Sequence, residues 1–184
     1  RRFRLGCPNC LKPLEFETKR SLEGKRMEAS SGQIEAKLAA LGCRLPDVPA
    51  PVGAYVPAVR TGNLVFLSGQ GPFRDGGAEY AGKVGSDFTV EEAYEIARQV
   101  ALRALAVLKQ EIGTLDKVRR IVKLVGWVNS APGFTQQPKV INGASDLLHE
   151  VFGERGQHAR SAVGAAELPL NIPVEIEMVV EVEP

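Results

Sequence analysis

The chain has 184 residues, of which 44% are hydrophobic and 24% charged, and its formal net charge is +1. This length and composition are typical of one globular domain with a buried core. The balance of 23 basic against 22 acidic side chains excludes a general electrostatic attraction to nucleic acid or to anionic membranes. No run reaches the roughly 18 apolar residues of a membrane span, and the beginning of the chain lacks an apolar signal segment. We therefore expect a cytoplasmic protein with neither nucleic acid nor membrane among its partners.

Residues 1–32 differ in character from the rest of the chain. Basic side chains are concentrated in them, and no sustained hydrophobic periodicity runs through them. We expect an N-terminal extension over residues 1–32, with Met27 as a hypothetical natural first residue, and a folded domain over residues 33–184.

Two of the three cysteines, Cys7 and Cys10, form a Cys-x-x-Cys motif within this extension. Such a pair supplies half of a structural zinc site, which needs four ligands. The remaining candidates, Cys43, His149 and His158, lie far along the chain, and we interpret both histidines as surface residues. An odd number of cysteines without framework spacing also favours a reducing compartment. We expect no metal and no cofactor.

The first expected elements are a short helix and a hairpin. Ile34, Leu38 and Leu41 have helical spacing, and Gly42 can end that helix. A proline-rich connector over residues 46–57 should be extended. Apolar segments on both sides of residues 61–63 (Thr-Gly-Asn) then predict two antiparallel strands, and we expect residues 73–85 to form a loop.

Two long helices follow. Thr89 and Glu92 fit a capping box, and apolar residues continue at helical spacing until Gly113, a plausible stop. A second helix should begin near Pro138, a favourable first-turn residue, and end at Gly153.

Three more strands complete the pattern. Residues 118–128 are rich in β-branched side chains, and residues 159–166 and 174–182 also have strand character. In the last strand Glu175, Glu177 and Glu181 alternate strictly with apolar residues. The order β-β-α-β-α-β-β predicts an α+β fold with two helices on one face of a mixed sheet. Because some strands are apolar on both faces, we also expect the uncovered faces of several subunits to pack together.

Three segments together resemble the RidA/YjgF family, also known as the endoribonuclease L-PSP or chorismate-mutase-like family. They are residues 51–55 (Pro-Val-Gly-Ala-Tyr), residues 67–70 (Leu-Ser-Gly-Gln), and a C-terminal signature of Ala-Arg-Ser-Ala-Val at 159–163, Leu-Pro at 168–169 and Val-Glu-Ile-Glu at 174–177. The order and spacing match from about residue 33 to residue 183. The resemblance implies a chorismate-mutase-like fold and a homotrimer with clefts between its subunits.

The resemblance also implies site residues and an activity. Arg160 corresponds to an arginine that binds a ligand carboxylate, and the positions that match residues lining the cleft are Tyr55, Ser68, Gly69 and Glu175. Asn142 or Ser145 corresponds to an asparagine on the second helix. The implied activity is hydrolysis of reactive 2-imino or 2-enamino acids to 2-oxo acids and ammonia.

The residue types suit that chemistry. Arg160 offers a bidentate fork to a carboxylate, and the Gly69 backbone allows close approach of a ligand. Glu175 can act as general base on a water molecule, with the Tyr55 hydroxyl assisting. Simpler interpretations remain open: alternating glutamates are typical of a solvated strand face, Tyr55 can cap a core edge, and Ser68 can bond its local backbone.

Two departures from the family pattern leave an alternative open. The deaminating branch often has a cysteine where this chain has Ala162, and the region of the second helix is longer. The alternative function is a non-catalytic trimer that binds a small carboxylate. RNA cleavage is disfavoured by the near-neutral charge and by the absence of an aromatic stacking platform.

Overall fold

The computed structural model describes residues 32–48, 53–74 and 76–184. The expectations for residues 1–31, including those for Met27 and the Cys7–Cys10 pair, lie outside these ranges. Gly32–Pro184 form one compact unit. Within it the main elements follow the expected order β-β-α-β-α-β-β, so the prediction of an α+β fold with a mixed sheet is confirmed.

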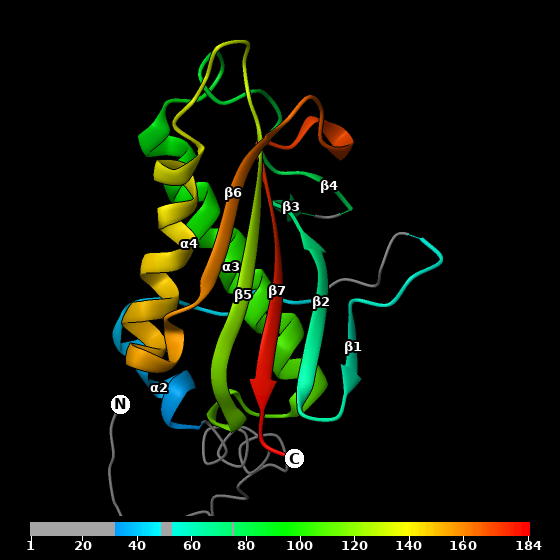
Figure 1. Cartoon of the computed structure of the whole chain (residues 1–184), viewed down its shortest axis with the longest axis vertical. Helices are drawn as coiled ribbons and strands as arrows, with labels where there is room; N and C mark the ends of the chain where they lie inside the picture. The colour runs from blue at the N-terminus through cyan, green and yellow to red at the C-terminus, as the bar shows by residue number, and fades with distance from the viewer. Residues whose placement is uncertain (1–31, 49–52, 75) are drawn as a thin grey trace, which may run out of the picture. The chain divides into compact units, whose positions relative to one another are not determined.

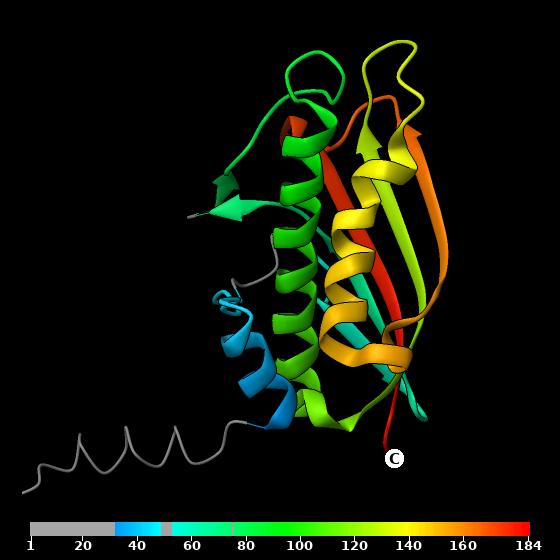
Figure 2. The same ribbon diagram turned by 90° about the vertical axis from the view of Figure 1, so that its left-hand side faces the viewer.

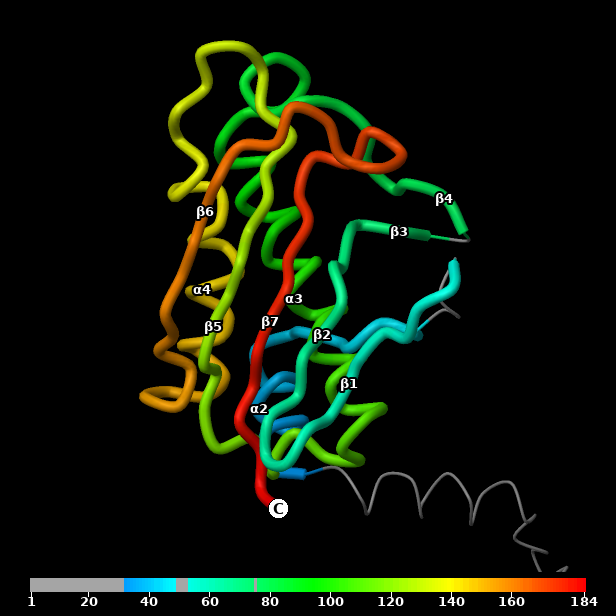
Figure 3. The backbone as a smooth tube through the Cα atoms, turned by 45° about the vertical axis from the view of Figure 1, so that its right-hand side comes forward, coloured from blue at the N-terminus to red at the C-terminus, as the bar shows by residue number. Residues whose placement is uncertain are grey.

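The main sheet has five strands in the order β1-β2-β7-β5-β6 (Figure 1). Their bounds are Ala58–Thr61 for β1, Leu64–Gln70 for β2, Val118–Asn129 for β5, Ala159–Ala165 for β6 and Val174–Val182 for β7. Neighbouring strands are antiparallel except β5 and β6, which are parallel and joined through a helix. Figure 3 shows β7 in the centre, between the early strands and the later ones.

Two long helices cover one face of this sheet, as Figure 2 shows. Helix α3 (Val90–Ile112) begins with the expected capping box: the Glu92 N–H donates to Thr89 Oγ1 over 3.2 Å, and the Thr89 N–H donates to Glu92 Oε2 over 2.9 Å. Helix α4 (Gln137–Phe152) has Pro138 in its first turn and ends at Gly153. The two helices and the sheet enclose the core.

The short helix α2 (Gln33–Ala40) is anchored by residues far along the chain. Its first N–H groups, on Gln33 and Ile34, each donate over 2.9 Å to the carboxylate of Asp116, in the 3₁₀ turn η1 (Leu115–Lys117). These bonds satisfy donors that a helix start leaves unpaired. Asp116 therefore acts as a long-range cap for α2.

The segment expected to be a loop, residues 73–85, contains a small two-stranded ribbon. It consists of β3 (Phe73–Arg74) and β4 (Gly77–Ala78), which pair antiparallel. Strands of two residues are too short for any alternation, so no periodicity could indicate them.

Near the entry to β7, the buried Asn129 is held by polar partners from two other segments. The Lys83 ammonium donates to Asn129 Oδ1 over 2.7 Å, and the Asn129 amide donates to Asn171 Oδ1 over 2.9 Å. Asn171 lies in the 3₁₀ turn η3 (Pro169–Asn171), three residues before β7 begins. Because a buried amide needs partners, these hydrogen bonds set where β7 starts.

The second face of the sheet is not covered by any helix of the described ranges. Its central row consists of Val59, Phe66 and Val179, which are register partners on β1, β2 and β7. Val59 is 53% exposed and Phe66 is 44% exposed. We call this the open face.

Candidate functional site

Arg160 lies on the helix-covered side of the edge strand β6. Its register partner on β5 is Leu124, whose own partner on β7 is Met178, and both side chains are buried against the helices. Partners in adjacent strands share a face of the sheet. The Arg160 side chain therefore projects toward α4.

Two side chains of α4 receive the Arg160 guanidinium. Arg160 Nη1 donates to Asn142 Oδ1 over 2.8 Å and to Ser145 Oγ over 3.0 Å. Asn142 and Ser145 are three residues apart, so they lie on one face of the helix. The sequence analysis left open which of the two serves the site, and the structure places both against Arg160.

His158 extends this group by one more side chain. Its Nε2 is 3.1 Å from Ser145 Oγ and its Nδ1 is 2.6 Å from the carbonyl oxygen of Gly156. Burial lowers the pKa of His158 below its ordinary value, and the nearby charge of Arg160 lowers it further, against the opposing effect of the Gly156 carbonyl. The interpretation of His158 as a surface residue is therefore wrong: the ring is half-buried and both nitrogens are engaged.

Glu175 projects from β7 onto the open face. It stands between the buried residues Val174 and Ile176, and its register partner on β5 is Trp127. Burial raises the pKa of Glu175 above its ordinary value, and the neighbouring charge of Glu177 adds to the effect. Glu177 itself accepts a hydrogen bond from Trp127 Nε1 over 3.2 Å. Its surroundings thus favour the neutral form of the Glu175 carboxyl.

Gly69 lies directly under the Glu175 side chain. A Cβ atom at Gly69 would be 2.8 Å from Glu175 Cδ and would overlap Oε1. The strand β2 is irregular at this point, since its pairing with β7 shifts register between Leu67 and Gln70. The absence of a side chain at position 69 therefore creates the space that the Glu175 carboxyl occupies.

Ser68 and Tyr55 are linked through the segment that leads into β1. The Ser68 hydroxyl donates to the carbonyl oxygen of Val56 over 2.7 Å, and the Ser68 N–H donates to that of Pro57 over 3.0 Å. Tyr55, the residue before Val56, is 53% exposed. Ser68 therefore anchors the segment that presents Tyr55, which is the simpler of the two roles considered for it.

The predicted residues fall into two groups on opposite faces of the sheet. Arg160 and Asn142 lie on the helix-covered side, whereas Glu175 and Gly69 lie on the open face. A ligand cannot reach both groups through the sheet of one chain. Arg160 and Glu175 of one chain therefore do not face a common space.

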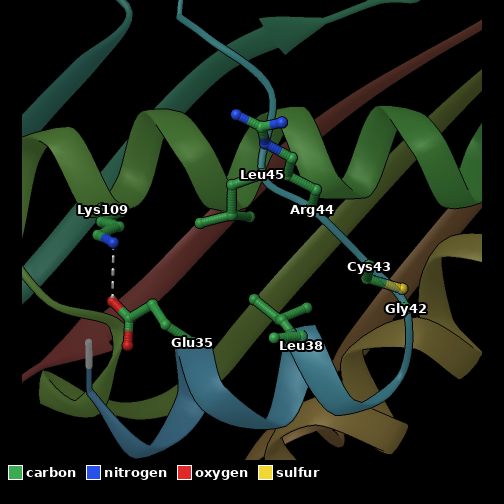
Figure 4. Close-up of a pocket in the computed structure, with 8 residues that line it drawn as sticks. Glu35, Leu38, Gly42, Cys43, Arg44, Leu45 and Lys109 are labelled. Atoms are coloured by element: carbon green, nitrogen blue, oxygen red, sulfur yellow. Dashed lines mark ion pairs between the residues drawn. The ribbon is translucent and has the colours of Figure 1, made fainter. Parts of the chain in front are cut away.

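The described residues contain a separate hollow of about 470 Å³ between α2 and α3 (Figure 4). In it Lys109 Nζ lies 3.5 Å from Glu35 Oε1, and Leu38 and Leu45 supply apolar walls. None of the predicted site residues lines it. Within residues 32–48, 53–74 and 76–184, no group of three or more His, Cys, Asp and Glu side chains is arranged to hold a metal ion. No helix of the same ranges has the length and apolarity that crossing a membrane requires.

Comparison with known proteins places these residues in a family. The model of the YjgF/chorismate mutase-like family matches residues 35–182. Protein TCP17 of Trypanosoma cruzi is 45% identical over 153 residues, which cover 83% of this chain and 96% of that protein. The crystal structure of protein Atu1372 from Agrobacterium tumefaciens, of unknown function, has 43% identity and a TM-score of 0.76, and the match covers 88% of this chain and 99% of that one. A 2-iminobutanoate/2-iminopropanoate deaminase of Dermatophagoides farinae is 29% identical over 143 residues, covering 75% of this chain and 93% of the deaminase. The chain belongs to the RidA/YjgF family.

Proposed function

We propose that the protein hydrolyses reactive 2-imino or 2-enamino acids to 2-oxo acids and ammonia, without a cofactor, in a cleft between subunits of a homotrimer. The observation that carries the proposal is the pairing of Glu175 with Gly69 on the open face. It combines a half-buried carboxyl of raised pKa with a glycine whose missing side chain leaves room for that carboxyl on the open face. The deaminase among the relatives supports the reaction class.

The placement of the residues supports a site shared between subunits. Arg160 belongs to the outer strand β6 and Glu175 to the central strand β7, on opposite faces. In the proposed assembly, the open face of one subunit brings Glu175 and Gly69 to the edge of a neighbour that carries Arg160. The apolar row of Val59, Phe66 and Val179, in which Val59 and Phe66 are exposed, provides area for such packing.

The proposed reaction needs only binding and proton transfer. Arg160 holds the substrate carboxylate through two N–H groups, which places the C=N carbon near Glu175. Glu175 accepts a proton from water while the water oxygen bonds to that carbon, and it passes this proton to the nitrogen to give a carbinolamine. Glu175 then accepts the carbinol O–H proton and returns it to the nitrogen as the C–N bond breaks, so the C=O of the 2-oxo acid forms and ammonia leaves. A carboxyl whose pKa lies above the ordinary range suits both steps.

A second candidate function is binding of a small carboxylate without turnover. Ala162 favours it, because the deaminating branch of the family often has a cysteine at this position. Ala162 lies on the same face of β6 as Arg160 and packs against the core. This chain therefore lacks the cysteine thiol that such a position would place beside Arg160. The two functions share Arg160 and differ in the need for Glu175.

The deciding experiment measures 2-oxo acid and ammonia formation from imines generated in place by an amino-acid oxidase, with semicarbazide trapping as the competing reaction. Wild type, Arg160→Ala and Glu175→Gln are compared at equal protomer concentration. The proposal expects acceleration by wild type, with the loss in Arg160→Ala mainly in KM and the loss in Glu175→Gln mainly in kcat. Binding of pyruvate by wild type without any acceleration would select the carboxylate-binding function instead.

A further inference from the structure

The hydrogen-bond chain behind Arg160 has a defined direction. The Gly156 carbonyl oxygen can only accept, so His158 Nδ1, 2.6 Å away, carries a hydrogen. In the neutral ring Nε2 is then an acceptor, and it receives the hydroxyl hydrogen of Ser145 over 3.1 Å. The Ser145 oxygen is left free to accept from Arg160 Nη1 over 3.0 Å. Each hydrogen bond of this series thus has one donor and one acceptor. Arg160 donates to Ser145, Ser145 donates to His158, and His158 donates to the Gly156 carbonyl oxygen.

This arrangement also selects the edge of the guanidinium that faces a ligand. Both hydrogens of Nη1 are used, one by Asn142 and one by Ser145. A guanidinium has five N–H groups, so the Nη2 and Nε hydrogens remain, and these form a parallel pair that matches a carboxylate. No other described residue bonds to these three hydrogens. The helix therefore holds one end of the group and leaves a bidentate edge for the ligand.

The platform that carries Ser145 is rigid because α4 is fastened to α3. Gly143 lies in contact with the backbone carbonyl of Tyr94, where any side chain at position 143 would collide. The Tyr94 hydroxyl donates to Asp146 Oδ2 over 2.9 Å, and the Arg98–Glu150 ion pair joins the helices further along. A rigid support limits the rotamers that Ser145 and Asn142 can adopt.

We propose that Ser145 and His158 are positioning residues that set the orientation of the Arg160 guanidinium and thereby the affinity for the substrate carboxylate. The inference rests on the proposed function in taking Arg160 as the carboxylate-binding group. Neither residue touches the substrate. Ser145 acts on Arg160 directly. His158 accepts the Ser145 hydroxyl hydrogen and thereby turns a lone pair of the Ser145 oxygen toward Arg160.

Matched substitutions separate this role from a packing role. Ser145→Ala removes the acceptor, whereas Ser145→Thr keeps the hydroxyl. His158→Leu removes the acceptor at the Nε2 position, whereas His158→Gln keeps an oxygen at similar reach. Ser86→Ala, which removes an exposed loop hydroxyl that bonds only Asp87, serves as the control.

The measurements are pyruvate binding by isothermal titration calorimetry and the kinetics of imine hydrolysis. Loss of one hydrogen bond to a charged group corresponds to roughly a tenfold change in affinity. We expect Ser145→Ala and His158→Leu to raise both the pyruvate Kd and the KM about tenfold, with kcat changed less than about twofold. Ser145→Thr, His158→Gln and Ser86→Ala should stay close to wild type. Side-chain NMR of the Arg160 Nε–H group gives a further readout in folded protein. The restricted rotation of the Arg160 guanidinium should be lost in Ser145→Ala.

The outcomes distinguish this inference from the proposed function. Wild type that binds pyruvate but hydrolyses no imine overturns the proposed reaction and leaves the binding comparison to decide the roles of Ser145 and His158. An unchanged Kd in folded Ser145→Ala, or equal damage from His158→Gln and His158→Leu, overturns the inference. Wild type that neither binds pyruvate nor hydrolyses imines overturns both.

Discussion

The contact between Gly69 and Glu175 allows a quantitative test of the open-face site. In Gly69→Ala the new methyl group would sit 2.8 Å from Glu175 Cδ and 3.2 Å from Cγ, and it would overlap Oε1. Because the overlapping atoms are the far end of a flexible, half-buried side chain, the cost is that of moving it off its preferred rotamer, about 0.5–1.5 kcal/mol of unfolding free energy. Because alanine is favoured over glycine in a strand by about 0.5–1 kcal/mol, the net change in stability should be small, within about 1 kcal/mol. The displaced carboxyl should also reduce imine hydrolysis strongly.

A double-mutant cycle isolates the overlap from the general effect of alanine. In a Glu175→Ala background the crowding atoms are absent, so adding Gly69→Ala should bring only the gain of about 0.5–1 kcal/mol. The coupling energy between the two positions should therefore be about 0.5–1.5 kcal/mol. Gly77→Ala is the matched control, since the nearest atom to a Cβ at that glycine, the Arg74 carbonyl oxygen, is 3.9 Å away.

The assay is urea unfolding at one fixed protomer concentration, because association changes apparent stability. Equal costs of Gly69→Ala in the wild-type and Glu175→Ala backgrounds would refute the reasoning. They would mean that the Glu175 side chain is not held over Gly69 and that no space on the open face is reserved for it.

Two further predictions concern stability. The folded state raises the pKa of Glu175 above its ordinary value of 4.5. Between pH 4.5 and the folded pKa, the folded state therefore binds more protons than the unfolded state. In that window the free energy of unfolding falls as the pH rises. Glu175→Gln should therefore be more stable than wild type at neutral pH, with the difference shrinking toward pH 4.5 in thermal unfolding; a pH-independent difference would contradict this. Asp116→Ala removes both capping bonds of α2 and should cost about 1 kcal/mol, with hydrogen exchange accelerated selectively at Gln33 and Ile34; unchanged exchange there would contradict the capping role.

Local patterns were sufficient to predict most of the fold. The Thr89–Glu92 capping box and the apolar stripe after it determine α3, and the alternation over residues 174–182 determines β7 together with the side on which Glu175 projects. The β3–β4 ribbon escaped prediction because its strands have two residues each. The long-range cap from Asp116 to α2 also left no local signal, since 82 positions separate it from Ile34.

The sequence names candidate site residues one by one, but it does not give their arrangement. The motif identifies Arg160, yet its face on β6 follows from the pairing with Leu124, which depends on tertiary register. For the same reason the sequence did not reveal that Ser145 and His158 lie behind Arg160. The spacing of His158 two positions before Arg160 was the available signal, because alternate residues of an extended segment share a side.

The central position of β7 has a consequence for how the chain folds. The β1–β2 hairpin forms between neighbours in sequence, and β5, α4 and β6 form a second local unit, but within the sheet the two are joined only through β7. During synthesis both units must wait, each with an unpaired strand edge, until residues 174–182 have emerged. Pairings so distant in sequence slow folding and prolong the exposure of edges to aggregation. In a shortened chain that ends before β7 the sheet should therefore stay divided into two parts, and the unpaired edges of β2 and β5 should favour aggregation.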